Sequence, residues 1–368
     1  MSDSPLFQRR SHDQAQDLRL LAAERRAAVH QERGDGRVSE STRVIAVTSG
    51  KGGVGKTSLT VNLAVTLAKL GKRVIVLDCD LGTANVDVML GMHPRYSLQH
   101  VLSRQRSLEE VMTVGPHGVR VISGGSGFSE LANLSDSRRD ELLTTFATLE
   151  GQADVLLLDT GAGISANVLR FVVAAGEALV VTTPEPTAVT DAYALIKVVS
   201  QQSGAASGQP DPRTDVRLRL VINQAASGAE AQETASNIVN VAQRFLGQRV
   251  QFFGSIPADR SVSQAVRAQT PVVDAFPRSP AAQAIDRLAR MLLDAPPAPD
   301  GALDYAADAA VPAPLTVAEA IGLPDQFDAA GPAAPVAAGG LRGFGGFVQR
   351  FLGVGRHHPG KSNGRMAS

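Results

Sequence analysis

The stretch "VIAVTSGKGGVGKTSLTVNLAVTLAKL", residues 44–70, runs from a β-branched apolar segment through a glycine-rich turn into a helical pattern. Within the turn, Gly50 to Thr57 match the spacing G-x-x-x-x-G-K-[ST] of a phosphate-binding loop. The motif requires a strand before it and a helix after it, and the sequence predicts both, over 43–49 and 58–70. The fold is therefore expected to be built around a P-loop.

Each part of this loop has an expected role. Glycines let backbone N–H groups turn inward around phosphate oxygens, at a helix N-terminus that attracts anions. We expect Lys56 to reach the β- and γ-phosphates and Thr57 to place its hydroxyl on Mg²⁺. A glycine-rich turn that only caps a helix is the alternative, and the agreement of residue types, spacing and context argues against it. The residues expected to bind nucleotide here are Gly50, Lys51, Gly52, Gly53, Val54, Gly55, Lys56, Thr57 and Ser58.

The region 42–294 around this loop alternates short apolar runs with helical patterns. Most of the runs are continuous rather than alternating, as in strands buried on both faces of a sheet. This predicts a doubly wound α/β fold of the P-loop NTPase class, with a mostly parallel twisted sheet covered by helices on both faces and ligands at the carboxyl ends of its strands. The predicted strands span 43–49, 73–78, 118–123, 154–159, 178–183, 217–223 and 250–256.

The rest of the 368-residue chain divides by composition. Residues 1–40 are polar and helix-prone, which predicts an N-terminal segment separate from the domain. Residues 295–338 are rich in Ala, Pro and Asp without a sustained period and predict a flexible linker. We expect an amphipathic segment over 339–356 and a disordered tail over 357–368.

Composition also argues against several classes of protein and of binding site. Lys+Arg and Asp+Glu both count 36, so no bulk charge draws the chain to nucleic acid or membrane. The single cysteine, Cys79, excludes an internal disulfide and a multi-cysteine metal or iron–sulfur site, and fits a reducing cytoplasm. A polar start and the lack of a long apolar run argue against a signal peptide and a spanning helix. We therefore expect a cytoplasmic protein.

Two acidic stretches extend the predicted nucleotide site. In "VLDCDLGTANVD", residues 76–87, Asp78 and Asp80 follow the second predicted strand. A carboxylate there can order the attacking water or a water on Mg²⁺. In "LLLDTGAGI", residues 156–164, Asp159 closes a buried strand and is expected to hold Mg²⁺ through water, as a Walker B aspartate does. Aspartates at strand ends often only cap the next helix, but their order after a P-loop favours a magnesium–nucleotide site.

A second lysine, Lys51, needs a separate explanation, because one lysine is enough to bind a phosphate. "KGGVGKT", residues 51–57, resembles the deviant Walker A signature of the MinD/ParA ATPases. The resemblance implies that Lys51 reaches across a homodimer interface to the partner's nucleotide, and that Lys51, Lys56 and Asp80 are catalytic. The alternative is a solvated surface lysine.

The same resemblance implies further site residues and identifies the nucleotide as ATP. Asp80 would position water in switch I, which also contains Asn85. Asn223 stands where the family has its adenine-binding asparagine, although a turn residue after a strand would look the same. Pro257 and Ala258 belong to "SIPADRSVSQAV", residues 255–266, which matches the loop covering the other side of the adenine. Gly161 departs from the MinD pattern, which usually has proline there.

Three segments resemble the FlhG branch of this family, also called FleN or YlxH: "DQAQDLR" (13–19), "SGGSGFSELANLS" (123–135) and "TTPEPTAVTDAYALIK" (182–197). In that branch the first segment stimulates the GTPase FlhF, and its glutamine, here Gln14, enters the composite active site. An ordinary amphipathic helix packed on its own domain is the alternative. The residues carrying the motif are Asp13, Gln14, Ala15, Leu18 and Arg19.

The C-terminal segment carries an apolar stripe at spacings of 3 and 4, with arginines near its edges. We expect it to fold against an anionic membrane surface, as the terminal helices of MinD and FlhG proteins do. A tail that packs on the domain or binds a protein is the alternative. The stripe consists of Leu341, Phe344, Phe347, Val348, Phe351 and Leu352.

Together these features predict an ATPase switch that controls flagellar number or placement by ATP-dependent dimerisation and association with the inner face of the cell membrane. FlhF is the expected partner, with flagellar switch proteins or a flagellar transcription activator as further candidates. A ParA/MinD-type ATPase for DNA partition or division-site positioning is one alternative, although no dense basic run predicts nucleic-acid binding. A scaffold or anti-activator with negligible turnover is another. A nitrogenase-reductase role is excluded, because its bridging cluster needs two cysteines per subunit.

Overall fold

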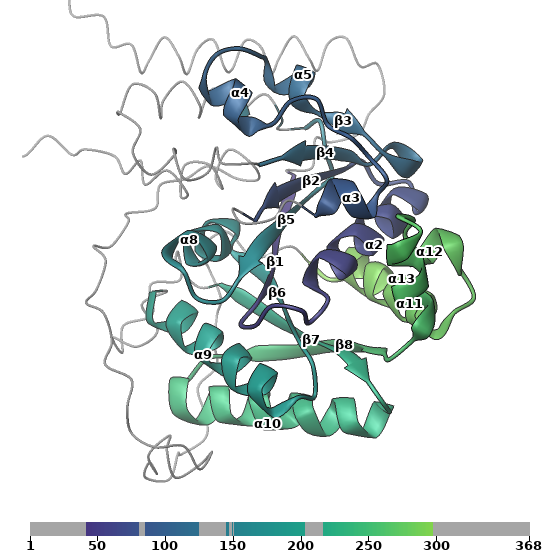
Figure 1. Ribbon diagram of the computed structural model, residues 1–368. Helices are drawn as coiled ribbons and strands as arrows, with labels where there is room; N and C mark the ends of the chain where they lie inside the picture. The colour runs from purple at the N-terminus through teal and green to yellow at the C-terminus, as the bar shows by residue number, and fades with distance from the viewer. Residues whose placement is uncertain are drawn as a thin grey trace, which may run out of the picture. The chain divides into compact units, whose positions relative to one another are not determined.

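The computed structural model describes residues 42–80, 85–124, 145–146, 149, 151–202 and 216–296. These residues form an eight-stranded sheet in the order β3-β4-β2-β5-β1-β6-β7-β8 (Figure 1). Every pairing is parallel except the antiparallel pair β3 and β4. The strands are β1 Arg43–Ser49, β2 Val74–Cys79, β3 Thr113–Val114, β4 Arg120–Ser123, β5 Val155–Ala162, β6 Glu177–Thr182, β7 Arg217–Ala225 and β8 Val250–Pro257.

Helices cover both faces of this sheet in a three-layer arrangement (Figure 1). One face is covered by α2 Lys56–Lys69, α3 Val86–Met89, α11 Arg260–Arg267, α12 Val272–Ala275 and α13 Pro280–Asp294. The other is covered by α4 Leu98–Leu102, α5 Leu108–Val111, α8 Ala166–Ala175, α9 Pro186–Gln202 and α10 Gly228–Leu246. The predicted α/β class is confirmed.

The strand sequences explain this layering. Along β1, Ile45 and Val47 enter the core on the α2 side, while Val44 and Ala46 enter the core on the α8 side. Successive side chains of a strand point to opposite faces, so a strand with a core on each side must be apolar at every position. The continuous apolar runs of the sequence are therefore the mark of a sheet buried on both faces.

The P-loop strand lies near the middle of the sheet, between β5 and β6. The chain leaves β1 at its carboxyl end, so the loop after it opens at the edge where ligands bind in doubly wound sheets. The strands that carry Asp78 and Asp159, β2 and β5, are hydrogen-bonded neighbours, with Asp78 directly opposite Asp159. This topology brings the glycine-rich turn and both acidic stretches together.

Several predicted bounds shift by one or two residues, and three differences matter most. The two-residue strand β3 was not predicted, because two residues are too short for a periodic pattern to show. Helix α2 begins at Lys56 rather than 58. Strand β5 continues to Ala162, so Asp159 lies inside it and not at its end. A register shift between Val47 and Ser49 allows Ser49 to pair with Ala162, which extends the strand.

A buried charge cluster lies at the opposite, amino-terminal edge of the sheet. Arg43 makes a bidentate ion pair with Glu177, with nitrogen–oxygen distances of 2.7 and 3.0 Å. Arg219 also forms an ion pair with Glu177, and both of these residues are 1% exposed. Arg43 further donates to the carbonyl of Ala295 at 2.9 Å, just beyond α13. The Glu177 carboxylate therefore joins β1, β6 and β7, and Arg43 connects it to the end of α13.

We predict that Glu177→Ala destabilises the fold by about 3–5 kcal/mol, because it leaves the buried guanidinium of Arg219 and the largely buried one of Arg43 without their counter-ion. Urea unfolding of the two proteins measures the difference. The matched control is Asp286→Ala, which breaks the exposed pair of Asp286 with Arg290 in α13 at 2.8 Å and should leave the midpoint almost unchanged. Equal midpoints for Glu177→Ala and the wild-type protein would contradict the assigned role of the cluster.

Candidate nucleotide site

The turn between β1 and α2 is shaped by glycines in two different ways. Gly53 and Gly55 have φ values of 81° and 88°, in the left-handed region that favours glycine. At position 50 a side chain has no room, because a Cβ atom there would lie 2.1 Å from the backbone oxygen of Asp191 in α9. The first residue of the loop therefore packs against the backbone of α9. Later residues of the loop adopt left-handed conformations before α2 begins.

Helix α2 has an N-terminus suited to an anion. Its N-cap residue is Gly55, which has no side chain to accept hydrogen bonds, and its first turn carries no acidic residue. The first N–H groups of a helix lack intrahelical acceptors and carry the positive end of the helix dipole. A phosphate group is the natural partner for such an end.

Asp159 is the buried centre of the site. It is 1% exposed and accepts hydrogen bonds from side chains of α2. Lys56 Nζ lies 3.1 Å from its Oδ1, Thr60 Oγ1 lies 2.8 Å from the same oxygen, and Thr57 Oγ1 lies 2.7 Å from Oδ2. The P-loop lysine and threonine thus meet the acidic residue of β5, as expected for residues that share one Mg²⁺–nucleotide site.

Asp78 organises the loop after β2. Its Oδ1 accepts the N–H of Asp80 at 3.1 Å, and its Oδ2 accepts the N–H groups of Asn85 at 3.1 Å and Val86 at 3.3 Å. One carboxylate therefore binds the backbone on both sides of residues 81–84, which lie outside the described residues. Burial, together with the nearby charge of Asp159, raises the pKa of Asp78 to about 7.

Asp80 lies beside the end of β5. A Cβ atom built on Gly161 would lie 3.7 Å from Asp80 Oδ1, an ordinary van der Waals contact, so this carboxylate adjoins position 161. Asp80 and Asp159 thus come from neighbouring strands toward the same edge of the sheet. The water-ordering role expected for Asp80 stays a prediction.

Lys51 contacts a different part of its own chain from Lys56. Its Nζ lies 2.7 Å from Glu185 Oε1 and 2.6 Å from Thr187 Oγ1, at the start of α9. The hydrogen bond from Lys51 lowers the pKa of Glu185. Glu185 and Thr187 were missed as site residues, although both lie in 182–197, one of the segments quoted for family resemblance.

Asn223 supports the P-loop directly. Its Nδ2 donates to the carbonyl of Val54 at 2.8 Å, and its Oδ1 accepts the N–H of Gln224 at 2.9 Å. Pro257 ends the neighbouring strand β8, and the N–H of Ala258 donates to the carbonyl of Ala225 at 2.9 Å. These residues lie at the carboxyl ends of β7 and β8, beside the loop; their contact with adenine stays a prediction.

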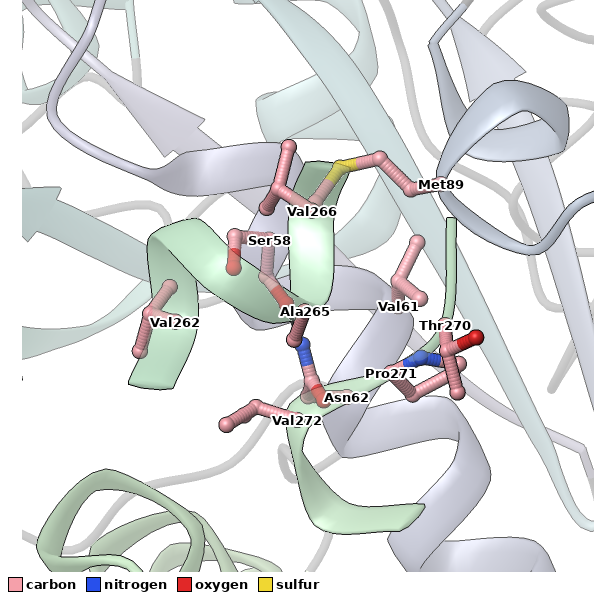
Figure 2. Close-up of a pocket in the computed structure, with 10 residues that line it drawn as sticks. All are labelled: Ser58, Val61, Asn62, Met89, Val262, Ala265, Val266, Thr270, Pro271 and Val272. Atoms are coloured by element: carbon pink, nitrogen blue, oxygen red, sulfur yellow. Dashed lines mark hydrogen bonds between the residues drawn. The ribbon is translucent and has the colours of Figure 1, made fainter. Parts of the chain in front are cut away.

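A small crevice lies beside the P-loop helix, between α2, α3 and the α11–α12 region (Figure 2). Ser58 and Asn62 of α2 lie on its wall, opposite Val262 and Ala265 of α11. Almost none of its space can hold even a water molecule, whereas small-molecule pockets are about 300–1,000 Å³, so this crevice is not the nucleotide site. The side chain of Ser58 therefore lines a neighbouring surface, while its backbone belongs to the first turn of α2.

The donor set fits Mg²⁺. The described residues contain no group of three or more His, Cys, Asp or Glu side chains that could hold a metal. Mg²⁺ is usually bound by one or two carboxylates together with substrate phosphates and water, so Thr57 and Asp159, with Asp80 nearby, suffice. Cys79 is buried.

Other sequence predictions lie outside the described residues. This holds for the N-terminal motif of Asp13, Gln14, Ala15, Leu18 and Arg19, and for the stripe of Leu341, Phe344, Phe347, Val348, Phe351 and Leu352. Within the described part of the chain, every helix is too short or too polar to cross a membrane.

The geometry defines a P-loop nucleoside triphosphatase with a second lysine in its glycine-rich loop. The family model described as "ParA: NUBPL iron-transfer P-loop NTPase" matches residues 40–293. The antiactivator FleN of Pseudomonas aeruginosa is 42% identical over 276 residues, which cover 74% of this chain and 95% of FleN. The flagellum site-determining protein YlxH of Helicobacter pylori is 34% identical over 257 residues, which cover 69% and 82%.

A solved structure of a MinD protein supports the same family. MinD of Pyrococcus horikoshii, complexed with Mg-ADP, has a TM-score of 0.52 and 25% identity, and the match covers 68% of this chain and 96% of that protein. The chain belongs to the ParA/MinD family of P-loop ATPases, in the branch called FlhG, FleN or YlxH. It is accordingly an ATP hydrolase.

The raised pKa of Asp78 predicts a pH-dependent stability. Between the ordinary carboxyl pKa of 3.8 and about 7, the folded protein keeps a proton that the unfolded chain has lost. Stability therefore falls as pH rises through this window and levels off above about 7. Asp78→Asn removes the titration, so the stability difference between variant and wild type should shift by roughly 2 kcal/mol in favour of the variant between pH 5.5 and 8.

Urea unfolding of both nucleotide-free proteins at the two pH values measures this shift. The comparison is made within each pH, so the many other titrating groups cancel. Asn also loses acceptor capacity toward Asn85 and Val86, but that loss is the same at every pH. A stability difference that does not change with pH would show that Asp78 is ionised throughout.

Proposed function

We propose that this chain is an ATP-driven switch that forms a homodimer with ATP and Mg²⁺ bound and separates after hydrolysis. The observation that carries the proposal is the different placement of the two P-loop lysines. Lys56 is buried against Asp159, whereas the Lys51 side chain is 34% exposed and lies at the surface with Glu185. A lysine at the surface beside the nucleotide loop is available to the phosphates of a second subunit.

Within one subunit, the roles follow from position. Lys56 and the N–H groups at the start of α2 would bind the phosphates, and Thr57 with Asp159 would hold Mg²⁺ directly or through water. The ion would neutralise charge on the phosphates. Asp80, fixed by the contacts of Asp78, would hold the attacking water, and Asn223 with Pro257 and Ala258 would adjoin the adenine.

The relatives favour a role in flagellar regulation. One is named an antiactivator and the other a flagellum site-determining protein, and the first is matched over 95% of its length. We propose that this chain likewise controls the number or placement of flagella. Its partners would be an FlhF-type GTPase, stimulated through the segment 13–19, and a flagellar transcription activator or flagellar switch proteins.

Membrane association would depend on the dimer. The segment 339–356 is short and contains several glycines, so one copy would bind an anionic membrane weakly. Two copies in one dimer bind far more strongly, because the second binding event is intramolecular. ATP would thus place the protein on the inner face of the cell membrane, and hydrolysis would release it.

We predict that Lys51→Ala abolishes ATP-dependent dimerisation and lowers the ATPase rate about 100-fold or more, because the partner's phosphates lose a positive charge. ATP binding by the single subunit should change little, since Lys56 and Thr57 remain. Analytical ultracentrifugation with and without ATP, together with phosphate release, measures both effects. The matched control is Lys69→Ala, which removes another lysine of an ion pair, with Asp274 at 3.0 Å, away from the P-loop. An undiminished dimer in Lys51→Ala would contradict the proposal.

We predict that the full chain stimulates GTP hydrolysis by FlhF and that Gln14→Ala removes the stimulation, because the amide of Gln14 would enter the GTPase site. Gln16→Ala is the matched control, since it changes the same residue type in the same segment at a position that the motif leaves undefined. Loss of stimulation in both variants, or in neither, would argue against a specific role for Gln14. That result would not bear on the proposal that the chain dimerises with ATP, which the Lys51→Ala experiment tests.

A further inference from the structure

Thr60 is a buried polar residue in the second turn of α2. It is fully buried, and it lies beyond the phosphate-binding motif, which ends at Thr57. A β-branched residue with a hydroxyl is a poorer helix former than alanine or leucine. A hydroxyl without access to water also needs a hydrogen-bond partner inside the protein.

The hydroxyl of Thr60 has two acceptors within reach. Its Oγ1 lies 2.8 Å from Asp159 Oδ1 and 3.1 Å from the carbonyl oxygen of Lys56. A hydroxyl has one hydrogen and donates to one acceptor at a time. The shorter distance and the negative charge both favour the carboxylate.

The contacts of Asp159 divide between its two oxygens. Oδ1 faces Thr60 and Lys56, while Oδ2 faces Thr57, the residue expected to bind Mg²⁺. The χ2 torsion of aspartate is broad, so the backbone alone does not decide where each oxygen points. A donor that fixes Oδ1 also fixes the direction of Oδ2.

The three donors to Asp159 differ in whether nucleotide binding would draw them away from it. Lys56 and Thr57 belong to the phosphate-binding motif and would turn to the phosphates and the ion. Thr60 is fully buried one turn further along the helix, so its contact does not compete with the nucleotide. It is the donor that Asp159 would keep when the other two leave.

Asp159 also needs such a donor because of its neighbour. Asp78 lies directly opposite it on β2, and when Asp78 is ionised the two like charges repel each other in a buried setting. When Lys56 moves to the phosphates, the pair of carboxylates loses a nearby positive charge. A fixed hydroxyl on Oδ1 then opposes rotation of the Asp159 carboxylate.

We propose that Thr60 is a positioning residue that holds Asp159 Oδ1 throughout the nucleotide cycle, so that Oδ2 stays directed at the Mg²⁺ side of the site. The inference rests on the proposed use of Mg²⁺–ATP. It assigns Thr60 no contact with nucleotide or ion, because it acts only through Asp159.

The test is the Mg²⁺ dependence of nucleotide binding by the full chain. Thr60→Val keeps the shape of the side chain and removes the hydroxyl, and Thr60→Ser keeps the hydroxyl. Binding of a fluorescent, non-hydrolysable ATP analogue is followed as Mg²⁺ is titrated. We expect Thr60→Val to raise the half-saturating Mg²⁺ concentration about 10-fold or more, as loss of an outer-shell partner does at metal sites. Binding in the presence of EDTA should be unchanged.

Thr66→Val is the matched control. Thr66 is a buried threonine of the same helix, and its Oγ1 donates to the carbonyl of Asn62 at 2.8 Å without contacting a carboxylate. It should leave the Mg²⁺ dependence as in the wild type, and Thr60→Ser should restore most of it. If Thr60→Val fails to fold, Thr60→Ala against Thr60→Ser replaces it, since both lack the methyl group and differ only in the hydroxyl.

The possible outcomes separate this proposal from the function on which it rests. A Mg²⁺ dependence in the wild type that Thr60→Val leaves unchanged overturns the role of Thr60 alone. Equal shifts in Thr60→Val and Thr66→Val also overturn it, because they report packing in α2 rather than the hydrogen bond to Asp159. Nucleotide binding that is independent of Mg²⁺ in the wild type overturns the proposed function and this inference with it.

Discussion

The site depends on one buried negative charge, the carboxylate of Asp159. An unpaired charge in a protein interior costs several kcal/mol, so it must be met by donors. Among the described residues, the side-chain donors to it come from the first two turns of α2, namely Lys56, Thr57 and Thr60. The same contacts fix the rotation of the helix on the sheet and close the glycine-rich loop around its start. The geometry of the P-loop is therefore inseparable from the charge on β5.

The second acidic residue extends this dependence to the loop after β2. Asp78 shares the buried edge of the sheet with Asp159 and binds the backbone on both sides of residues 81–84. Buried charges interact more strongly than exposed ones, because water does not screen them. A change in the partners of Asp159 therefore alters the electrostatic environment of Asp78. Asp78 in turn holds the segment that carries Asp80 through its hydrogen bonds. This is a physical route from the phosphate loop to the water-ordering residue.

The features predicted well from sequence are those with a local signature. Short continuous apolar runs rich in Val and Ile, such as that of β2, are typical of strands with a core on each face, and the P-loop has fixed residue types at fixed spacing. The features that were missed depend on register between distant segments. Glu177 looks like a solvated strand end until β6 is placed between β1 and β7, where it meets Arg43 and Arg219. Thr60 likewise looks like an ordinary helix residue until α2 is docked on β5.

The contacts of the two P-loop lysines differ in how easily they are exchanged. The pair of Lys56 with Asp159 is buried, so breaking it requires another anion to take the place of the carboxylate, and phosphate is such an anion. The pair of Lys51 with Glu185 is exposed and screened by solvent, so Lys51 can leave it at little cost. A residue that has to serve a second subunit reversibly needs a resting contact of this weak kind. The asymmetry between the lysines is thus what a switch requires: a firm contact for its own nucleotide and an easily released one for the partner's.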